Sequence, residues 1–369
     1  MRKLIINCIA SAILLTNCTS KSDLTIGRTE NGLTVFSGTL PAIKLKSNQI
    51  SLGNFILPTR IKLIDDYLFI TDLKRSEGMV AIYDLENRRF IKSIIPNGSG
   101  PYELSAVSSI IPGNSGKVYF YDVQSLRLLE SDLSQLVNDS TFQPNFVKRI
   151  LFDNYEKPLR IVNISDTSFL TFSVPGIKGR FSTMDSKFDL TGFQFGEYPP
   201  IQKKGELYEM TEISYFSKVL ANLYACSIAT HQSGNLVVAH NNVDVIEIYN
   251  YTNSSRVLRI VGPDQNFPPE YSMSSSQQAF PCKECRCGYS SPQATAEYIA
   301  VLRLEKLYSN PDAYISNLIY LFDWSGNLIK ILELDAQISE FVIDEKRQKI
   351  FAVAFDQDEP LLEYNLSIE

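Results

Sequence analysis

The sequence predicts an all-β fold, a six-bladed β-propeller, and three observations lead to it. Short apolar segments are separated by Gly, Asn and Asp, and aromatic residues make up 11% of the chain, which is typical of strands. One four-strand unit is visible near the start, and parts of it return five more times. The last copy stops after its third strand, so a segment from elsewhere must complete it.

The first copy of the unit can be divided almost residue by residue. Short polar or Gly- and Asn-containing turns separate four predicted strands: 60–64, 67–72, 80–85 and 89–95. Four antiparallel strands joined by tight turns form a meander, which is the blade of a propeller. Residues 60–95 are therefore predicted to form the first blade.

The second and third strands of this unit recur together along the rest of the chain. The recurring pairs are 117–122 with 126–133, 168–174 with 180–190, 235–240 with 245–250, 298–303 with 318–324, and 349–356 with 360–366. An acidic or Asn residue ends the third strand of each copy: Asp84, Asp132, Asp185, Asn250, Asp323 and Asn365. The pair at 168–190 matches least well, and the count of copies is six.

The incomplete last copy predicts how the ring is closed. Residues 41–52 precede the first blade, alternate in places and belong to no copy of the unit. We expect them to pair with 360–366 and to seal the ring through backbone hydrogen bonds, so that 41–369 form one propeller. A β-sandwich would not repeat a four-strand unit six times, and a seven-bladed ring would need a blade hidden in an insertion.

Two insertions interrupt the strand pattern. In the first, at about 203–224, apolar residues such as Leu207, Met210 and Ile213 recur at helical spacing and predict a helix. We favour a helix packed against one face of the propeller over an element that docks a partner. The second, at about 263–292, is rich in Pro, Ser, Gln and Cys and is predicted to be a long loop, where binding sites often lie.

The first residues predict export rather than a membrane-spanning helix. Two basic residues precede an apolar stretch at 4–15, which is shorter than the ~20 residues needed to cross a bilayer. The segment LLTNC, which ends at Cys18, resembles a bacterial lipobox. We therefore expect 1–17 to be a signal peptide, Cys18 to be lipidated and 18–40 to be a tether to the membrane. The alternative is an ordinary secretory signal that releases a soluble protein.

The charge of the chain bears on its partners. The formal net charge is −6 and the isoelectric point is near 5.2. Proteins that bind nucleic acid need a basic face that displaces counterions, so this composition argues against nucleic acid as a partner. No later apolar run approaches membrane-spanning length, so the lipid is the only membrane contact that we expect.

Four further cysteines are candidates for disulfides or for a metal site: Cys226, Cys282, Cys285 and Cys287. In an oxidising compartment an even set of thiols usually forms disulfides, and we favour these. A bridge from Cys226 to the later cluster is geometrically reasonable, because the fourth and fifth copies should be neighbours. Free or partly paired thiols and a four-thiolate metal site remain as alternatives.

The two histidines, His231 and His240, both fall in the fourth copy, at the ends of its first and second strands. Without a paired carboxylate pattern such residues are more often structural, so they are weak binding candidates. The sequence has no Ser/His/Asp arrangement, zinc-protease motif, nucleophile elbow or P-loop. The motifs therefore assign no catalytic residue and no cofactor, although a divalent cation remains an alternative.

Three stretches carry a resemblance to a known family: NGSGPYEL at 97–104, the segment 213–250 and the segment 319–366. They are similar to the TolB-like six-bladed propeller lipoproteins of Bacteroidetes. The resemblance implies the propeller fold and a lipid-anchored place in the bacterial cell envelope, at the outer membrane. It implies little about activity, because fold does not determine function. In NGSGPYEL we expect a structural turn whose Glu103 accepts hydrogen bonds from neighbouring backbone amides.

Two functions from different classes remain. The first is non-catalytic binding or scaffolding, in which one face of the propeller presents a site for a protein, peptide or glycan. The second is a hydrolase or lyase that works in the central channel with a bound divalent cation. Inward-facing carboxylates from three or more blades would favour the second, and scattered polar and aromatic groups would favour the first. We favour binding.

Overall fold

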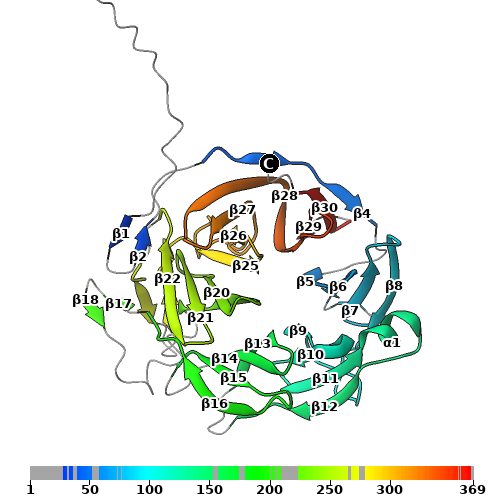
Figure 1. Cartoon of the computed structure of the whole chain (residues 1–369). Coiled ribbons are helices and arrows are strands. Elements are labelled where there is room, and N and C mark those ends of the chain that lie inside the picture. Colours follow the sequence, from blue (N-terminus) through cyan, green and yellow to red (C-terminus); the bar gives the residue numbers. More distant parts are fainter. Residues whose placement is uncertain are drawn as a thin grey trace, which may run out of the picture.

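The computed structural model describes residues 28–366, apart from 31–32, 36–39, 52–57, 73, 76, 153–156, 174–178, 200, 204–205, 209–222, 265–266, 274–278, 356 and 358. Antiparallel sheets are arranged around a central axis, and their strands follow one another outward from it (Figure 1). This is the all-β propeller that the sequence predicts. The expected signal peptide at 1–17 and Cys18, the expected lipidation site, lie outside the described residues.

Three of the sheets are separate four-stranded meanders. The first contains β5 (Pro58–Ile64), β6 (Tyr67–Asp72), β7 (Val80–Asp84) and β8 (Arg89–Ile94). The second contains β9 (Ser109–Pro112), β10 (Lys117–Asp122), β11 (Arg127–Asp132) and β12 (Asn145–Arg149). The third contains β13 (Pro158–Ser165), β14 (Ser168–Ser173), β15 (Phe181–Met184) and β16 (Leu190–Phe195). The predicted strands of the first unit are confirmed.

The fourth meander is extended at its outer edge. It contains β19 (Cys226–His231), β20 (Asn235–His240), β21 (Val245–Asn250) and β22 (Ser255–Val261). Beyond β22, a strand from the N-terminal segment, β2 (Leu33–Val35), pairs in parallel, and β1 (Arg28–Glu30) pairs with β2.

An eight-stranded sheet holds two more meanders that share one long strand. The 17-residue β28 (Leu328–Asp344) pairs through its first part with β27 (Ser316–Asp323) and through its second part with β29 (Lys349–Ala354). β26 (Tyr298–Arg303) and β25 (Tyr289–Ala294) follow inward from β27, and β30 (Leu361–Asn365) follows outward from β29. The outer strand of one meander thus continues directly as the inner strand of the next.

The N-terminal segment runs along the outer edges of the last three meanders (Figure 1). After β2, β3 (Ile43–Leu45) pairs in parallel with β28, with Ile43 opposite Leu332. β4 (Asn48–Ile50) then pairs antiparallel with β30, with Gln49 opposite Leu362. This is the pairing that the sequence predicts between 41–52 and 360–366, and it places β4 as the fourth strand of the last meander.

The residue that ends the third strand caps the following turn in the first five copies. The side-chain oxygen of Asp84 accepts hydrogen bonds from the backbone amides of Glu86 and Asn87, at 3.0 Å each. The equivalent residues in the next four copies cap the turn that follows in the same way: Asp132, Asp185, Asn250 and Asp323. Asp and Asn recur here because their short side chains can hold the turn into the fourth strand.

Apolar clusters fill the spaces between neighbouring meanders. Phe69 and Phe120 meet between the first two, with ring centroids 6.2 Å apart. The cluster between the last meander and the first includes Ile50 of β4 together with Ile70 and Val353. The first and last repeats are therefore joined by side-chain packing as well as by the pairing of β4 with β30.

The insertions differ from their predictions. Residues 206–208, expected to be helical, form β18 (Glu206–Tyr208), because their backbone pairs antiparallel with β17 (Ile201–Lys203). Most of the remaining helical prediction, 209–222, lies outside the described residues. The expected loop at 263–292 contains a short hairpin of β23 (Tyr271–Met273) and β24 (Ala279–Pro281), and its end is taken by β25.

One short helix was not expected from the sequence. α1 (Leu133–Asn138) follows β11, and the side chain of Asp132 caps it by accepting from the amides of Ser134 and Gln135. Leu133 and Leu136 of this helix are buried in the cluster between the first two meanders. The same Asp that ends the third strand therefore also begins a helix.

Candidate functional site

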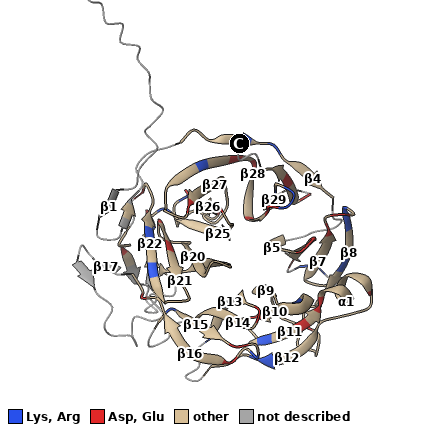
Figure 2. Cartoon of the chain, in the orientation of Figure 1, with Lys and Arg blue, Asp and Glu red and all other residues tan. Residues whose placement is uncertain are grey.

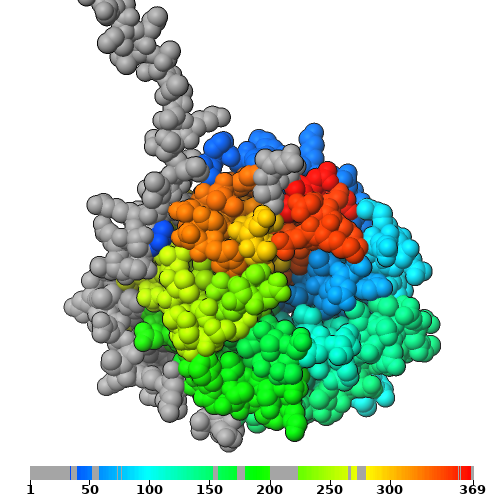
Figure 3. All heavy atoms as spheres, in the orientation of Figure 1, coloured from blue at the N-terminus to red at the C-terminus, as the bar shows by residue number. Residues whose placement is uncertain are grey.

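The innermost strands of all six meanders line a central channel. A cavity of about 330 Å³ is bounded by residues of β5, β9, β13, β19, β25 and β28. The space-filling view shows a small hollow at the axis, where the meanders meet (Figure 3). Because every repeat contributes one strand to this wall, residues far apart in the sequence converge there.

Charged residues of both signs are distributed around the ring (Figure 2), but the ionisable side chains of the channel wall are mainly basic. They are Arg60 and Lys62 on β5, Arg160 on β13 and Glu340 on β28. The Lys62 side chain is open to water within the channel, but protein surrounds it, and this confinement lowers its pKa. The same confinement raises the pKa of Glu340, against the opposing effect of Arg60. Charges in this channel are therefore incompletely solvated.

Hydrogen bonds between inner strands hold the wall in place. Glu340 accepts from the backbone amide of Ile61 at 3.1 Å, which links β28 to β5. The hydroxyl of Ser109 accepts from the amide of Ile161 at 3.2 Å, and Thr230 donates to the carbonyl of Asn163 at 2.7 Å. These contacts connect strands of different meanders, so the fold itself holds the wall in place.

The channel does not fit a cation site made of several carboxylates. Among its lining residues, Glu340 is the one carboxylate, whereas the enzyme hypothesis expects three or more blades to contribute one each. In the described part of the chain, no three His, Cys, Asp or Glu side chains are grouped so that they could hold a metal ion.

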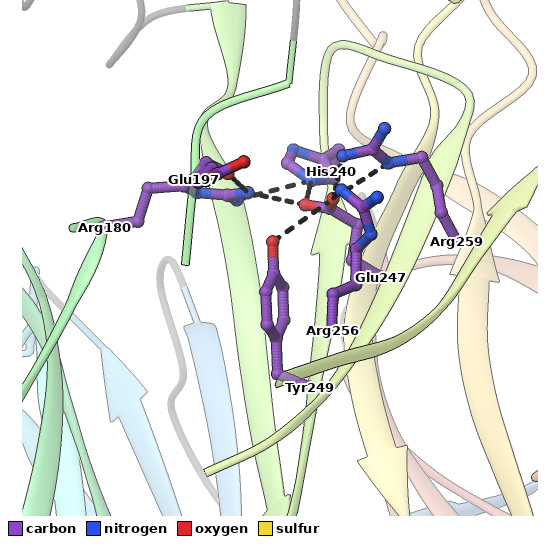
Figure 4. Close-up of polar contacts among 7 residues, drawn as sticks. All are labelled: Arg180, Glu197, His240, Glu247, Tyr249, Arg256 and Arg259. Atoms are coloured by element: carbon purple, nitrogen blue, oxygen red, sulfur yellow. Dashed lines mark hydrogen bonds and ion pairs between the residues drawn. The ribbon is translucent and has the colours of Figure 1, made fainter. Parts of the chain in front are cut away.

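His240 lies in a second polar cluster, buried between the third and fourth meanders (Figure 4). At its centre is Glu247 of β21, which is fully buried. Its carboxylate accepts from Arg180 at 2.5 Å, from the Nη2 of Arg259 at 2.7 Å and from Tyr249 at 3.3 Å, and its Oε2 lies 3.0 Å from the Nε2 of His240. Arg180 immediately precedes β15, so one carboxylate joins two repeats.

The charges of this cluster are set by burial and by ion pairing. Burial alone would raise the pKa of Glu247, but Arg180, the bond to His240 and Arg259 outweigh it and hold that pKa well below its ordinary value. For His240, burial dominates and lowers the pKa to about 4, so the ring is neutral at neutral pH. His240, Glu247 and Arg180 have no exposed surface, which makes this cluster a structural link rather than a binding site.

Lowering the pH from 7 to 4 is expected to destabilise the protein through His240. In the unfolded chain this imidazole titrates near 6.5, but in the folded protein it titrates at about 4. Between these values the unfolded chain binds the additional proton, so the free energy of unfolding falls as the pH falls, by about 3 kcal/mol in all. Urea unfolding of the wild type and of His240→Gln at pH 7, 6, 5 and 4 measures the effect. The variant should show the shallower dependence above pH 4.5, and equal slopes would contradict this assignment.

The other histidine lies elsewhere. His231 is the last residue of β19 and pairs with Asn235. His240 pairs with Cys226, which is the first residue of β19. Its Nδ1 is 2.8 Å from the hydroxyl of Ser233, and its ring centroid is 5.6 Å from that of Trp324. The two histidines therefore do not share a site.

The cysteines pair differently from the predicted bridge between Cys226 and the later cluster. Cys282 and Cys285 form a disulfide with their Cα atoms 5.1 Å apart, and Cys226 and Cys287 are free. Cys226 packs in the core between the third and fourth meanders, and Cys287 packs in the core between the fifth and sixth. The predicted bridge is wrong because the two thiols face different cores, and the four thiols do not converge on a metal.

The segment NGSGPYEL forms the predicted structural turn. The carboxylate of Glu103 accepts from the amide of Gly100 at 2.7 Å. A Cβ added at Gly98 would lie 2.1 Å from the same carboxylate, so only Gly leaves room for this contact. The turn is therefore held by its own side chain.

Sequence reasoning missed the charged groups of the channel and Glu247. The available signal is a charged residue at the centre of a short apolar strand, as in Lys62 of RIKLI, Arg160 of LRIV and Glu247 of VIEIY. Such a residue must either face water or meet a partner across the fold. The sequence alone does not say which of these happens.

The protein resembles solved propeller structures at low sequence identity. A Bacteroides fragilis protein named "Putative exported protein" aligns with a TM-score of 0.53 at 12% identity, over 90% of this chain and 98% of that one. The extracellular domain of a B. thetaiotaomicron "putative one component system" aligns with a TM-score of 0.43 at 12% identity, over 84% of this chain and 33% of that one. A luciferin-regenerating enzyme aligns with a TM-score of 0.48 at 7% identity, over 87% and 95% of the two chains.

No curated protein matches the sequence. Within the described ranges, every helix is too short or too polar to cross a bilayer. The family model named "TolB-like 6-blade propeller-like" matches residues 40–346. The chain therefore belongs to the TolB-like six-bladed propeller family.

Proposed function

We propose that the protein is a non-catalytic binding module of the bacterial envelope and that its ligand enters the central channel. The observation that supports this most is the wall itself, to which the inner strand of each meander contributes. A cavity of about 330 Å³ is at the small end of the range for ligand pockets, so it suits a small molecule or one projecting group of a larger ligand.

We propose that the N-terminal segment closes the ring that carries this site. The pairing of β4 with β30 supports this, as does the packing of Ile50 against the first and last meanders. A closed ring leaves the last meander without an open edge there and keeps the inner strands at fixed distances. A preformed channel loses little entropy when it binds its ligand.

We also propose that a lipid on Cys18 anchors the protein to the membrane. The sequence LLTNC supports the anchor, and export would agree with the name "Putative exported protein" of the similar Bacteroides fragilis structure. The predicted tether, 18–40, is too long, because β1 and β2 lie within it and extend the sheet of the fourth meander. Residues 19–27 would connect the lipid to the propeller. Metabolic labelling with palmitate should mark the wild type but not Cys18→Ser, and equal labelling would exclude this anchor.

Blocking the channel should abolish ligand capture. Ser227 lies on β19 in the channel wall, and Ser227→Trp would fill part of the cavity. Ser255→Trp places the same side chain at an exposed position of β22 and is the matched control. Purified variants, checked for folding by circular dichroism, are incubated with envelope extract, and the retained peptides and glycans are identified by mass spectrometry.

We expect a component that the wild type and Ser255→Trp retain and that Ser227→Trp does not. If all three proteins retain the same components, the ligand does not use the channel. If the purified protein instead cleaves a lactone or a glycan, and Ser227→Trp does not, the binding proposal is wrong and the hydrolase alternative is correct.

A further inference from the structure

We propose that the central channel recognises a small anionic ligand, one that presents a carboxylate or a phosphate to Arg60, Lys62 and Arg160. This inference rests on the proposed binding function of the channel and specifies the chemistry of its ligand. The whole chain carries a net charge of −6, yet three of the four ionisable side chains that line the channel are basic. The positive charge of this site is therefore not a consequence of the composition.

The protein neutralises these three cations only in part with its own groups. Glu340 is the one carboxylate in the wall, and it is shared between Arg60 and Lys62. Within the described residues, the side chains of Arg60 and Lys62 donate no hydrogen bond to a protein acceptor. Arg160 donates to the backbone carbonyl of Ser108 at 2.9 Å, and a neutral carbonyl leaves its charge uncompensated.

Other arginines in the interior of this protein form ion pairs with its own carboxylates. Arg180 and Arg259 both pair with Glu247, and Arg303 pairs with Asp244 and Asp264. Placing a charge out of bulk water is costly unless a partner of opposite sign is present. The contrast indicates that the partner of the channel cations comes from outside the chain.

The chemistry of these groups matches an oxyanion. The planar guanidinium of arginine binds carboxylate or phosphate through two parallel hydrogen bonds, and lysine adds a compact positive charge. Confinement lowers the pKa of Lys62, and an anion beside it would restore the stability of its charged form. Walls of low polarisability also concentrate a positive potential in the channel, which attracts anions from solution.

Calorimetric titration tests this inference with three anions and one neutral control. Glucuronate, citrate and inorganic phosphate are titrated into the full mature chain at constant ionic strength, and glucose serves as the uncharged counterpart of glucuronate. We expect at least one of the anions to bind, and glucose to bind at least tenfold more weakly than that anion or not at all. Comparing the carboxylates with phosphate tells the two ligand types apart.

Charge removal inside the channel is compared with charge removal outside it. Arg160→Gln and Lys62→Gln should each weaken binding of the anion by about 10- to 100-fold, since a hydrogen bond to a charged group contributes about 1.5–3 kcal/mol. Arg149→Gln and Lys46→Gln remove the same charges from exposed positions and should leave the affinity unchanged. Arg160→Lys keeps the charge and should fall between Arg160→Gln and the wild type.

The outcomes separate this inference from the proposal on which it rests. If none of the three anions binds, or if the channel and surface variants weaken binding equally, the anionic ligand is excluded. If glucose and glucuronate bind equally and Ser227→Trp blocks both, the channel still binds ligands but does not select for charge. If envelope extract yields no component that depends on an open channel, the binding function itself fails. Thermal unfolding of each variant shows whether a loss of binding reflects a loss of folding.

Discussion

Replacing Glu247 with Gln is expected to lower the free energy of unfolding by about 3–5 kcal/mol, because it removes one partner from a buried ionic cluster. Glu247 has no exposed surface and accepts from Arg180, Arg259 and Tyr249. In the variant, two buried guanidinium groups lose their counter-charge but remain in the interior. The amide of Gln also places a donor where the cluster needs an acceptor.

Urea unfolding at pH 7 of wild type and Glu247→Gln measures this difference. The matched control is Glu130→Gln, which also removes a strand carboxylate that is paired with a base, in this case Lys117. Both side chains of that pair are about one third or more exposed, so we expect a loss below about 1 kcal/mol. Similar losses in the two variants would show that the Glu247 cluster does not hold the third and fourth meanders together.

Removing residues 1–52 is expected to cost on the order of 5 kcal/mol of stability, because the last meander would lose its outer strand. The deletion removes Leu45 and Ile50, which are 9% and 4% exposed, from the cores on either side of the last meander. It also exposes the backbone donors and acceptors of β30 along the edge that β4 covers. An open strand edge promotes association between molecules.

Thermal unfolding and light scattering together test this prediction. The control is removal of residues 1–27, which leaves β1 to β4 in place and should unfold like the longer chain. The protein that lacks 1–52 should unfold at a lower temperature and should scatter more light at equal concentration. If both truncated proteins are monomeric and unfold at the same temperature, the ring does not depend on the N-terminal strands.

The interfaces between adjacent repeats explain why large losses of stability are expected from changes away from the channel. A propeller blade contacts only its neighbours, so the stability of the ring depends on each interface between adjacent repeats. Glu247 acts at one such interface and β4 at another. Variants in the channel wall should cost less stability, since the wall is partly open to water, and this separates tests of binding from tests of folding.

The sequence alone determined much of the fold, because many of its features depend on local chemistry. The strands of the first unit, the recurring Asp or Asn after each third strand and the Glu103 turn all depend on residues close together in the chain. The pairing of 41–52 with 360–366 was also predictable, because a repeat that lacks one strand needs a segment that belongs to no repeat. Periodicity and turn preferences act over a few residues, and a repeated unit multiplies that evidence.

The tertiary structure alone decided the candidate site and the partners of the buried polar groups. Arg60, Arg160 and Glu340 line one cavity because three inner strands converge on one axis, although up to 280 residues separate them in the sequence. The same dependence explains why the bridge from Cys226 was predicted wrongly, since which core a thiol faces is set by the orientation of its strand. Strand patterns record whether a side chain is buried, but the identity of its neighbours depends on how the repeats are placed around the ring.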